Sequence, residues 1–185
     1  MQVSGYYGGA NGLDKKMSDS LKLGRGPFGT PVSVTEANIQ YHNKGWQVKA
    51  LATVINMADA QKINNVYASN TPTAMAGGYV ELGYNTLRLF KPETTKNFTL
   101  FARYEYLDMN SKIPTNALSD GYMKKHYFVT GITCQPTRGV SFKADYVIRT
   151  TGNYNSALYT GTPDNNGYAF SRMNQFVNLG MAYSF

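Results

Sequence analysis

The end of the chain alternates strictly between large apolar side chains and small or polar ones. In residues 177–185 the odd positions are Val, Leu, Met, Tyr and Phe, and the even positions are Asn, Gly, Ala and Ser. A period of two places these sets on opposite faces of a β-strand. The apolar set ends in Tyr183 and Phe185, which suits an aromatic girdle at a membrane boundary. The edge of a soluble β-sandwich also alternates in this way, so this segment alone leaves both classes open.

Composition favours the membrane class. Aromatic residues make up 14% of the chain and charged residues 16%, and there are 18 glycines. Globular proteins average about 25% charged residues. No uninterrupted apolar run approaches the roughly 20 residues of a membrane-spanning helix. A chain that is aromatic and glycine-rich but lacks such a run is typical of a β-barrel, in which only one face of each strand is apolar.

Seven further segments show the same alternation, some of them weakly. They are residues 2–7, 32–41, 45–55, 75–84, 97–107, 127–135 and 140–148. Strands of roughly 9–11 residues match a tilted crossing of the hydrocarbon layer. The sequence therefore predicts an all-β chain, an antiparallel transmembrane β-barrel with about eight strands, in a single domain over residues 1–185.

The predicted connections alternate in length. Residues 42–45, 91–96 and 136–139 form short connections, and residues 8–30, 56–73, 108–125 and 150–171 form long ones. Membrane barrels have short turns on the periplasmic side and longer loops outside, whereas a soluble sandwich has no reason to separate them. The pattern favours the membrane class and predicts that the C-terminus lies on the periplasmic side. Residues 58–65 have the composition of a short helix, and an irregular loop remains open for them.

The sequence contains no convincing catalytic or cofactor motif. Residues 24–29 match GxGxxG by letters, but no apolar strand precedes them and Pro27 blocks the helix that should follow. His42 and His126 have no neighbouring ligand set, and Cys134 is the only cysteine. The formal net charge of +7 comes without a Lys/Arg run or a nucleic-acid reader motif. We expect no enzyme activity, no metal, no cofactor and no nucleic acid partner.

Charged residues fall on the polar face of several predicted strands. In a narrow barrel they would pair and fill the interior, and in a wide barrel they would line water and set ion preference. Four are basic and three are acidic, which predicts a mild preference for anions; Glu36 falls on the same face. The predicted pore-lining residues are Lys49, Glu81, Arg103, Glu105, Lys143, Asp145 and Arg149.

Residues 72–84, 100–106, 140–146 and 178–185, taken in order, resemble strand blocks of the phosphate-selective porin O/P-like outer-membrane porin family. The resemblance runs from about Val32 to Phe185 and covers the C-terminal half of such a porin. It implies a passive channel in the bacterial outer membrane for small hydrophilic solutes or anions, commonly a homotrimer. It also implies that the barrel-assembly machinery recognises the last strand, which ends in Phe185. The family's constriction arginines and lysines have no match here, so phosphate selectivity does not carry over.

Strand count decides between two functions. About eight strands close into a barrel filled by side chains, whereas 16–18 strands leave an aqueous channel. Residues 1–5 do not resemble an export signal, so we expect further strands before Met1 and a barrel of about 16 strands. The alternative is a small non-conducting outer-membrane barrel with a structural or adhesive role.

Overall fold

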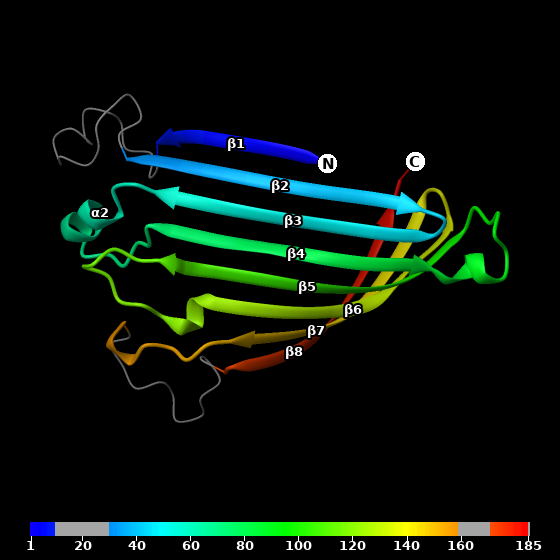
Figure 1. The fold of residues 1–185 in the computed structure, drawn as a ribbon. Coiled ribbons are helices and arrows are strands. Elements are labelled where there is room, and N and C mark those ends of the chain that lie inside the picture. The colour runs from blue at the N-terminus through cyan, green and yellow to red at the C-terminus, as the bar shows by residue number, and fades with distance from the viewer. Residues whose placement is uncertain (10–29, 159–170, 185) are drawn as a thin grey trace.

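Eight antiparallel strands form one sheet in which each strand pairs with its neighbour in the sequence (Figure 1). The computed structural model describes residues 1–9, 30–158 and 171–184. The strands are β1 (Gln2–Gly9), β2 (Pro31–Asn43), β3 (Trp46–Met57), β4 (Ala74–Asn85), β5 (Asn97–Lys112), β6 (Lys124–Thr137), β7 (Val140–Thr151) and β8 (Met173–Tyr183). Each segment predicted from the alternating pattern overlaps one of them, with residues 45 and 184–185 falling outside, so the all-β antiparallel prediction is confirmed. Phe185 and the GxGxxG letters lie outside the described residues.

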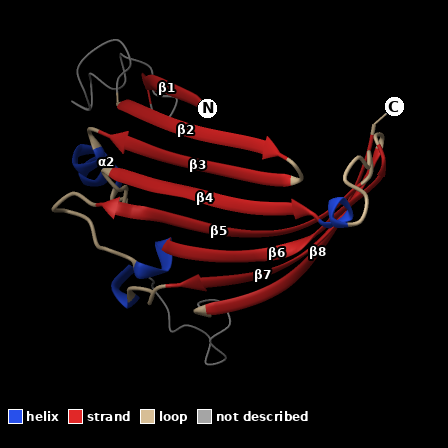
Figure 2. Ribbon diagram, turned by 45° about the vertical axis from the view of Figure 1, so that its right-hand side comes forward, coloured by secondary structure: helices blue, strands red, loops and turns tan. Residues whose placement is uncertain are grey.

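The sheet curls along its width, so that β6, β7 and β8 turn away from the plane of the first strands (Figure 2). Its order runs from β1 to β8 without a crossover, and within the described residues β1 and β8 each have a single strand neighbour. The sheet is therefore open at both edges. Among the same residues, no helix is long and apolar enough to cross a membrane.

The connections gather at two ends of the strands, as Figure 1 shows. The turn rim comprises residues 44–45, 86–96 and 138–139. The loop rim comprises residues 58–73 and 113–123 together with the described residues 30, 152–158 and 171–172. The predicted alternation of lengths holds only in part. Because β5 and β6 extend further than their apolar patterns, residues 113–123 form a connection no longer than residues 86–96. The latter contains a 3-10 helix, η1 (Thr86–Leu89).

The turn between β2 and β3 is the tightest kind of hairpin. Lys44 and Gly45 have φ values of 46° and 92°, and the register pairs Asn43 with Trp46 around them. Positive φ at both central residues is the type I′ geometry, whose twist matches that of the flanking strands. Glycine adopts it without steric cost. This turn sets the register of the whole β2–β3 ladder.

Polar side chains join the connections of the loop rim. The segment before β4 contains the helix α2 (Ala60–Tyr67), which confirms the helical alternative for that region. The Asn70 side chain exchanges two hydrogen bonds of 2.9 Å with the backbone of Leu118. The Asn116 amide donates to Gln61 O and Asn65 Oδ1 of α2. The connections β3–β4 and β5–β6 are thereby fixed to each other.

The two faces of the sheet differ in what they bury. The face that carries Phe101, Val129 and Val147, here called the inner face, contains the small apolar core, with Val129 and Val147 only 3% and 5% exposed. Side chains on the concave side of a curled sheet converge and cover one another. The opposite, outer face carries most of the exposed large apolar side chains of the strands; Tyr6 and Phe176, on the edge strands, are exceptions. The more exposed face of the sheet is thus the more apolar one.

Gly131 allows β6 and β7 to approach each other. A Cβ added there would lie 2.8 Å from Asp145 Cα and closer still to the carbonyl oxygen of Ala144, whereas a Cβ on Gly180 of β8 would meet nothing within 4 Å. We expect Gly131→Ala to lower the free energy of unfolding by about 1–3 kcal/mol through overpacking. Gly180→Ala, on the same face, should be neutral or raise it by about 0.5–1 kcal/mol. Urea unfolding followed by the fluorescence of the single tryptophan, Trp46, measures both; equal effects would contradict this packing.

Candidate functional site

The strand register brings the seven charged residues predicted from the sequence to one face of the sheet. Cross-strand partners in an antiparallel ladder share a face. Lys49, Glu81 and Arg103 are consecutive partners across β3, β4 and β5. The same register puts the other four on this inner face, Glu105 on β5 and Lys143, Asp145 and Arg149 on β7. Their common face is thus a structural fact, and their lining of a pore stays a prediction.

The first group of charges lies where β3, β4 and β5 run side by side. Glu81 lies between two cations: its Oε1 is 3.0 Å from Lys49 Nζ and its Oε2 is 3.7 Å from Arg103 Nη1. Arg103 Nε is 2.8 Å from Glu105 Oε1, an ion pair whose angle does not make a hydrogen bond. The guanidinium carbon also lies 5.5 Å from the centre of the Tyr79 ring. Each carboxylate of this group is therefore paired with at least one cation, Glu81 with Lys49 and Arg103, and Glu105 with Arg103.

The second group lies on β7 and β8. Lys143 Nζ is 3.2 Å from Asp145 Oδ2 and 4.8 Å from the centre of the Phe101 ring. Asp145 is buried, and its Oδ1 accepts a 2.8 Å hydrogen bond from the amide of Asn178. Arg149 donates to Asn174 Oδ1 at 2.8 Å. The asparagines of β8 thus act as neutral partners for the charges of β7.

A recess of about 310 Å³ lies between the two groups on the inner face. Three of the predicted basic residues but a single acidic one reach it, so its charged lining carries an excess of positive charge. Hydroxyl and amide groups supply the rest of the polar lining. The lining residues are Gln47, Lys49, Glu81, Thr99, Phe101, Arg103, Thr133, Gln135 and Lys143. Such a lining can solvate a small hydrophilic solute and favours one with negative charge.

Not every predicted residue reaches the recess. Glu105, Asp145 and Arg149 lie on the same face outside its lining. The neutral lining residues were missed by the sequence analysis, which followed charge alone. Thr99 of β5 and Gln135 of β6 occupy inner-face positions of strands that the alternating pattern predicts. Counting every polar residue of the inward set would have found them.

The histidines do not take part in this site. His126 lies on the outer face, where its Nδ1 is 2.7 Å from the hydroxyl of Tyr104, and His42 is exposed near the turn rim. Among the described residues no group of three or more His, Cys, Asp or Glu side chains is placed to hold a metal ion. The inner face offers ion pairs, amides and hydroxyls around a recess, an arrangement suited to contact with water and small solutes.

No family model matches the chain, and no solved structure matches it. An uncharacterised protein of Aquifex aeolicus (strain VF5) is 26% identical over 155 residues, which include 73% of this chain and 35% of that protein. The chain thus spans about a third of the length of this relative. Because the relative is itself uncharacterised, the similarity assigns no activity.

The Lys49–Glu81 pair should contribute measurably to stability. Its side chains are 35% and 14% exposed, so the attraction is only partly screened by water. In a double-mutant cycle with Lys49→Met and Glu81→Gln we expect a coupling of about 1 kcal/mol in the free energy of unfolding. The more exposed Asp59–Lys62 pair of α2 is the control, tested with Asp59→Asn and Lys62→Met, and its coupling should stay below about 0.5 kcal/mol. A coupling free energy of zero between Lys49 and Glu81 would contradict the pairing.

Proposed function

We propose that this chain forms part of the wall of a bacterial outer-membrane porin, a β-barrel that lets small hydrophilic solutes diffuse passively, with a mild preference for anions. The observation that carries the proposal is the distribution of side chains on the two faces. Apolar and aromatic groups lie on the outside of the curl, and paired charges with a polar recess lie on the inside. A pore through a membrane needs lipid on one side of its wall and water on the other.

The outer face is too apolar for contact with water. Val80 at its centre is 56% exposed and Leu179 on β8 is 81% exposed. Soluble monomers rarely expose contiguous apolar patches larger than a few hundred Å². The other exposed apolar residues on this face of the sheet include Ile39, Tyr41, Trp46, Val54, Leu82, Leu100, Tyr104, Phe128, Ile132, Phe142, Tyr146, Val177, Met181 and Tyr183. Contact with hydrocarbon would satisfy all of them at once.

The open edges of the sheet bear on the size of the barrel. Unpaired strand edges are not tolerated in lipid, so β1 and β8 require further strand partners if the outer face meets hydrocarbon. We include in the proposal additional strands that complete a barrel of about 16, the number at which an aqueous channel opens. The resemblance to the porin O/P-like family supports this size. It also supports a homotrimer and recognition of the C-terminal strand by the assembly machinery.

The anion preference follows from the charges that reach the recess. Lys49, Arg103 and Lys143 line it together with a single carboxylate, that of Glu81. Glu105 and Asp145 pair with Arg103 and Lys143, and their carboxylates lie outside the lining. A solute at the recess therefore contacts three cationic groups and one carboxylate directly, with the other two carboxylates behind the cations. Nothing in the proposed transport requires a catalytic group, and we propose a passive channel rather than an enzyme.

A closed eight-stranded barrel without a channel is the second candidate, because the strand count equals that of small filled barrels. Such a barrel would serve a structural or adhesive role. It requires β1 and β8 to pair with each other. The conductance measurement below separates the two candidates.

Replacing Val80 by arginine tests whether the outer face meets lipid. At the bilayer midplane an arginine on the lipid-facing side of a barrel costs about 2–4 kcal/mol, whereas at a water-exposed site the change stays within about 0.5 kcal/mol. We expect the larger loss in urea unfolding from phosphatidylcholine vesicles. Val66→Arg on α2, at a residue that is also exposed, is the matched control and should have little effect. Equal small effects at both positions would refute a lipid-facing outer face.

Planar-bilayer recordings of the reconstituted protein test the channel. We expect stable open-channel steps and an anion-selective reversal potential in a KCl gradient. Lys49→Gln with Lys143→Gln should lower the chloride-to-potassium permeability ratio by about two- to threefold, because two lost charges change the local potential by about kT. Lys62→Gln with Lys112→Gln, outside the recess, is the control. A folded barrel that stays silent would support the second candidate, and a cation-selective parent would reject the anion preference.

A further inference from the structure

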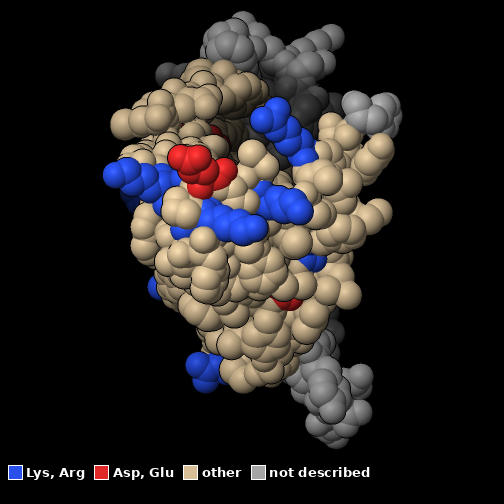
Figure 3. Space-filling model, turned by 90° about the vertical axis from the view of Figure 1, so that its right-hand side faces the viewer, with Lys and Arg blue, Asp and Glu red and all other residues tan. Residues whose placement is uncertain are grey.

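Basic side chains gather at the turn rim. Its three connections carry Lys44, Arg88, Lys91, Lys96 and Arg138, here called the basic rim, and a single acidic residue, Glu93. Four of the five are exposed and Arg88 is half-buried. Figure 3, which looks at this end of the molecule, shows Lys and Arg side chains gathered there. The basic rim is therefore a concentrated positive surface at one end of the strands.

Several cations of the described residues form ion pairs, and those of the basic rim do not. Within the described part of the chain, none of its five side chains forms an ion pair. On the inner face Lys49, Arg103 and Lys143 are paired with carboxylates, and at the opposite end of the strands Lys62 and Lys124 face Asp59 and Asp108. Unpaired, exposed cations attract anions from outside the protein.

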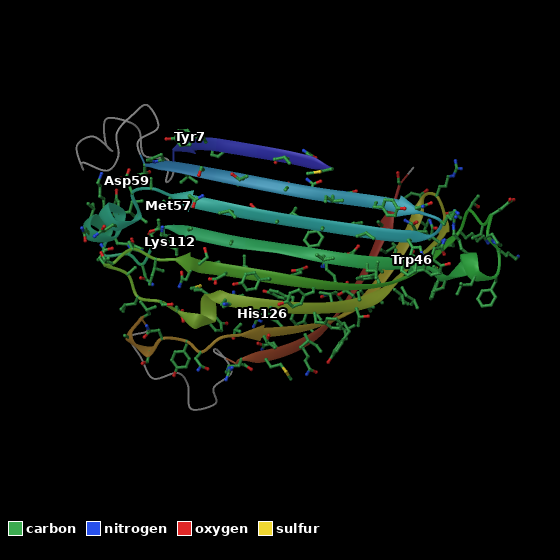
Figure 4. The ribbon with its side chains drawn as sticks, in the orientation of Figure 1. Tyr7, Trp46, Met57, Asp59, Lys112 and His126 are labelled. Atoms are coloured by element: carbon green, nitrogen blue, oxygen red, sulfur yellow. The ribbon has the colours of Figure 1, made fainter. Side chains whose placement is uncertain are left out.

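Apolar side chains lie at the same level. Leu89 and Phe90 in the β4–β5 connection are 66% and 83% exposed, directly between Arg88 and Lys91 in the sequence. Trp46 follows the Lys44–Gly45 turn and packs against Tyr84, with ring centres 4.8 Å apart and ring planes tilted by 51°. Figure 4 shows Trp46 at this end of the strands and Lys112 at the other. Aromatic rings beside cations are typical of a membrane–water boundary.

The geometry around Gly45 brings two of the cations to one recess. A Cβ on Gly45 would lie 2.9 Å from Arg88 Cδ, so the stem of Arg88 runs against the hairpin turn that carries Lys44. A recess of about 230 Å³ lies beside them and also receives His42. Its remaining polar side chains are the amides of Asn43, Gln47, Asn85 and Asn97, and no carboxylate lines it. The amide nitrogens of Asn43, Asn85 and Asn97 already donate within the protein. Lys44 and Arg88 are therefore the groups at this recess that suit a phosphate.

We propose that the basic rim binds the phosphate headgroups of anionic phospholipids in the adjacent leaflet of the membrane, with Leu89 and Phe90 inserted at the interface. The inference rests on the proposed function, since it requires the outer face to meet lipid. The aromatic pair Trp46–Tyr84 and the exposed apolar residues favour a bilayer over an acidic protein as the partner. Bound lipid would also hold the turn rim at a fixed depth in the membrane.

Trp46 makes the proposal directly measurable, because it is the only tryptophan and lies at the basic rim. The protein is reconstituted in phosphatidylcholine vesicles that contain a small fraction of a dansyl-headgroup lipid, either phosphatidylglycerol or phosphatidylcholine. Energy transfer from Trp46 reports which lipid lies near the rim. We expect about twofold or greater transfer to the phosphatidylglycerol probe over the phosphatidylcholine probe, and a loss of this ratio as salt rises.

Charge removal at the rim is the decisive comparison. The variant Lys44→Asn, Arg88→Gln and Lys91→Gln should bring the ratio of the two probes close to one; asparagine is used because it tolerates the positive φ of residue 44. The control Lys62→Gln, Lys112→Gln and Lys124→Gln removes three charges from the opposite end of the strands. It should leave the ratio of transfer to the two probes unchanged. Circular dichroism verifies that both variants are folded. If the triple variant fails to fold, the salt dependence of the parent decides.

The outcomes separate this inference from the proposed function. Equal, strong transfer to both probes in the parent would mean that Trp46 meets the bilayer without preference, which overturns the lipid site and leaves the porin proposal intact. Absence of transfer to either probe from folded protein would overturn both. A ratio that is high but unaffected by salt and by the triple variant would also overturn the role of the basic rim.

Discussion

Each strand from β2 to β7 is hydrogen-bonded on both sides, so successive side chains must point to opposite faces of one sheet. The chemical difference between the two faces follows from which residues occupy these two sets of positions. Small and apolar groups fill one set, and charged, amide and hydroxyl groups fill most of the other. A shift of one residue in any ladder would exchange the two sets and bring charges to the outer face. The Lys44–Gly45 turn and the packing at Gly131 oppose such shifts.

Charged side chains on the inner face and at the turn rim differ in whether they have ionic partners. On the inner face carboxylates and cations lie in pairs, across neighbouring strands as with Lys49 and Glu81 or along one strand as with Lys143 and Asp145. Buried charges need such partners, and removing one member leaves the other uncompensated. At the turn rim, exposure to solvent removes that requirement, and Lys91 and Lys96 remain without ionic partners among the described residues. Most of the paired charges therefore lie on the inner face, and the exposed cations of the turn rim are free to attract anions from outside the protein.

Several features were predictable from the sequence because they depend on local periodicity. All eight strands were recognised, as was the common face of residues such as Arg103 and Lys143. Strand ends were not, because polar residues such as Asn110 and Ser111 continue β5 without the apolar alternation that marks its middle. The connection after β5 is therefore shorter than predicted. The connection before β5 is longer than predicted, because it begins with the 3-10 helix η1 (Thr86–Leu89). The helix α2 was left undecided because its stability depends on contacts with residues 113–123.

The sequence by itself determined which residues share a face, since a period of two translates directly into sidedness. Only the tertiary structure decided which members of a face come together. The recess forms because the curl of the sheet brings Lys143 of β7 toward Lys49 and Arg103, which no spacing along the chain indicates. The exposure of Val80 and Leu179 and the burial of Val129 likewise depend on the direction of that curl. Curvature arises from the summed twist and packing of all the strands, and it is therefore a property of the assembled sheet rather than of any one segment.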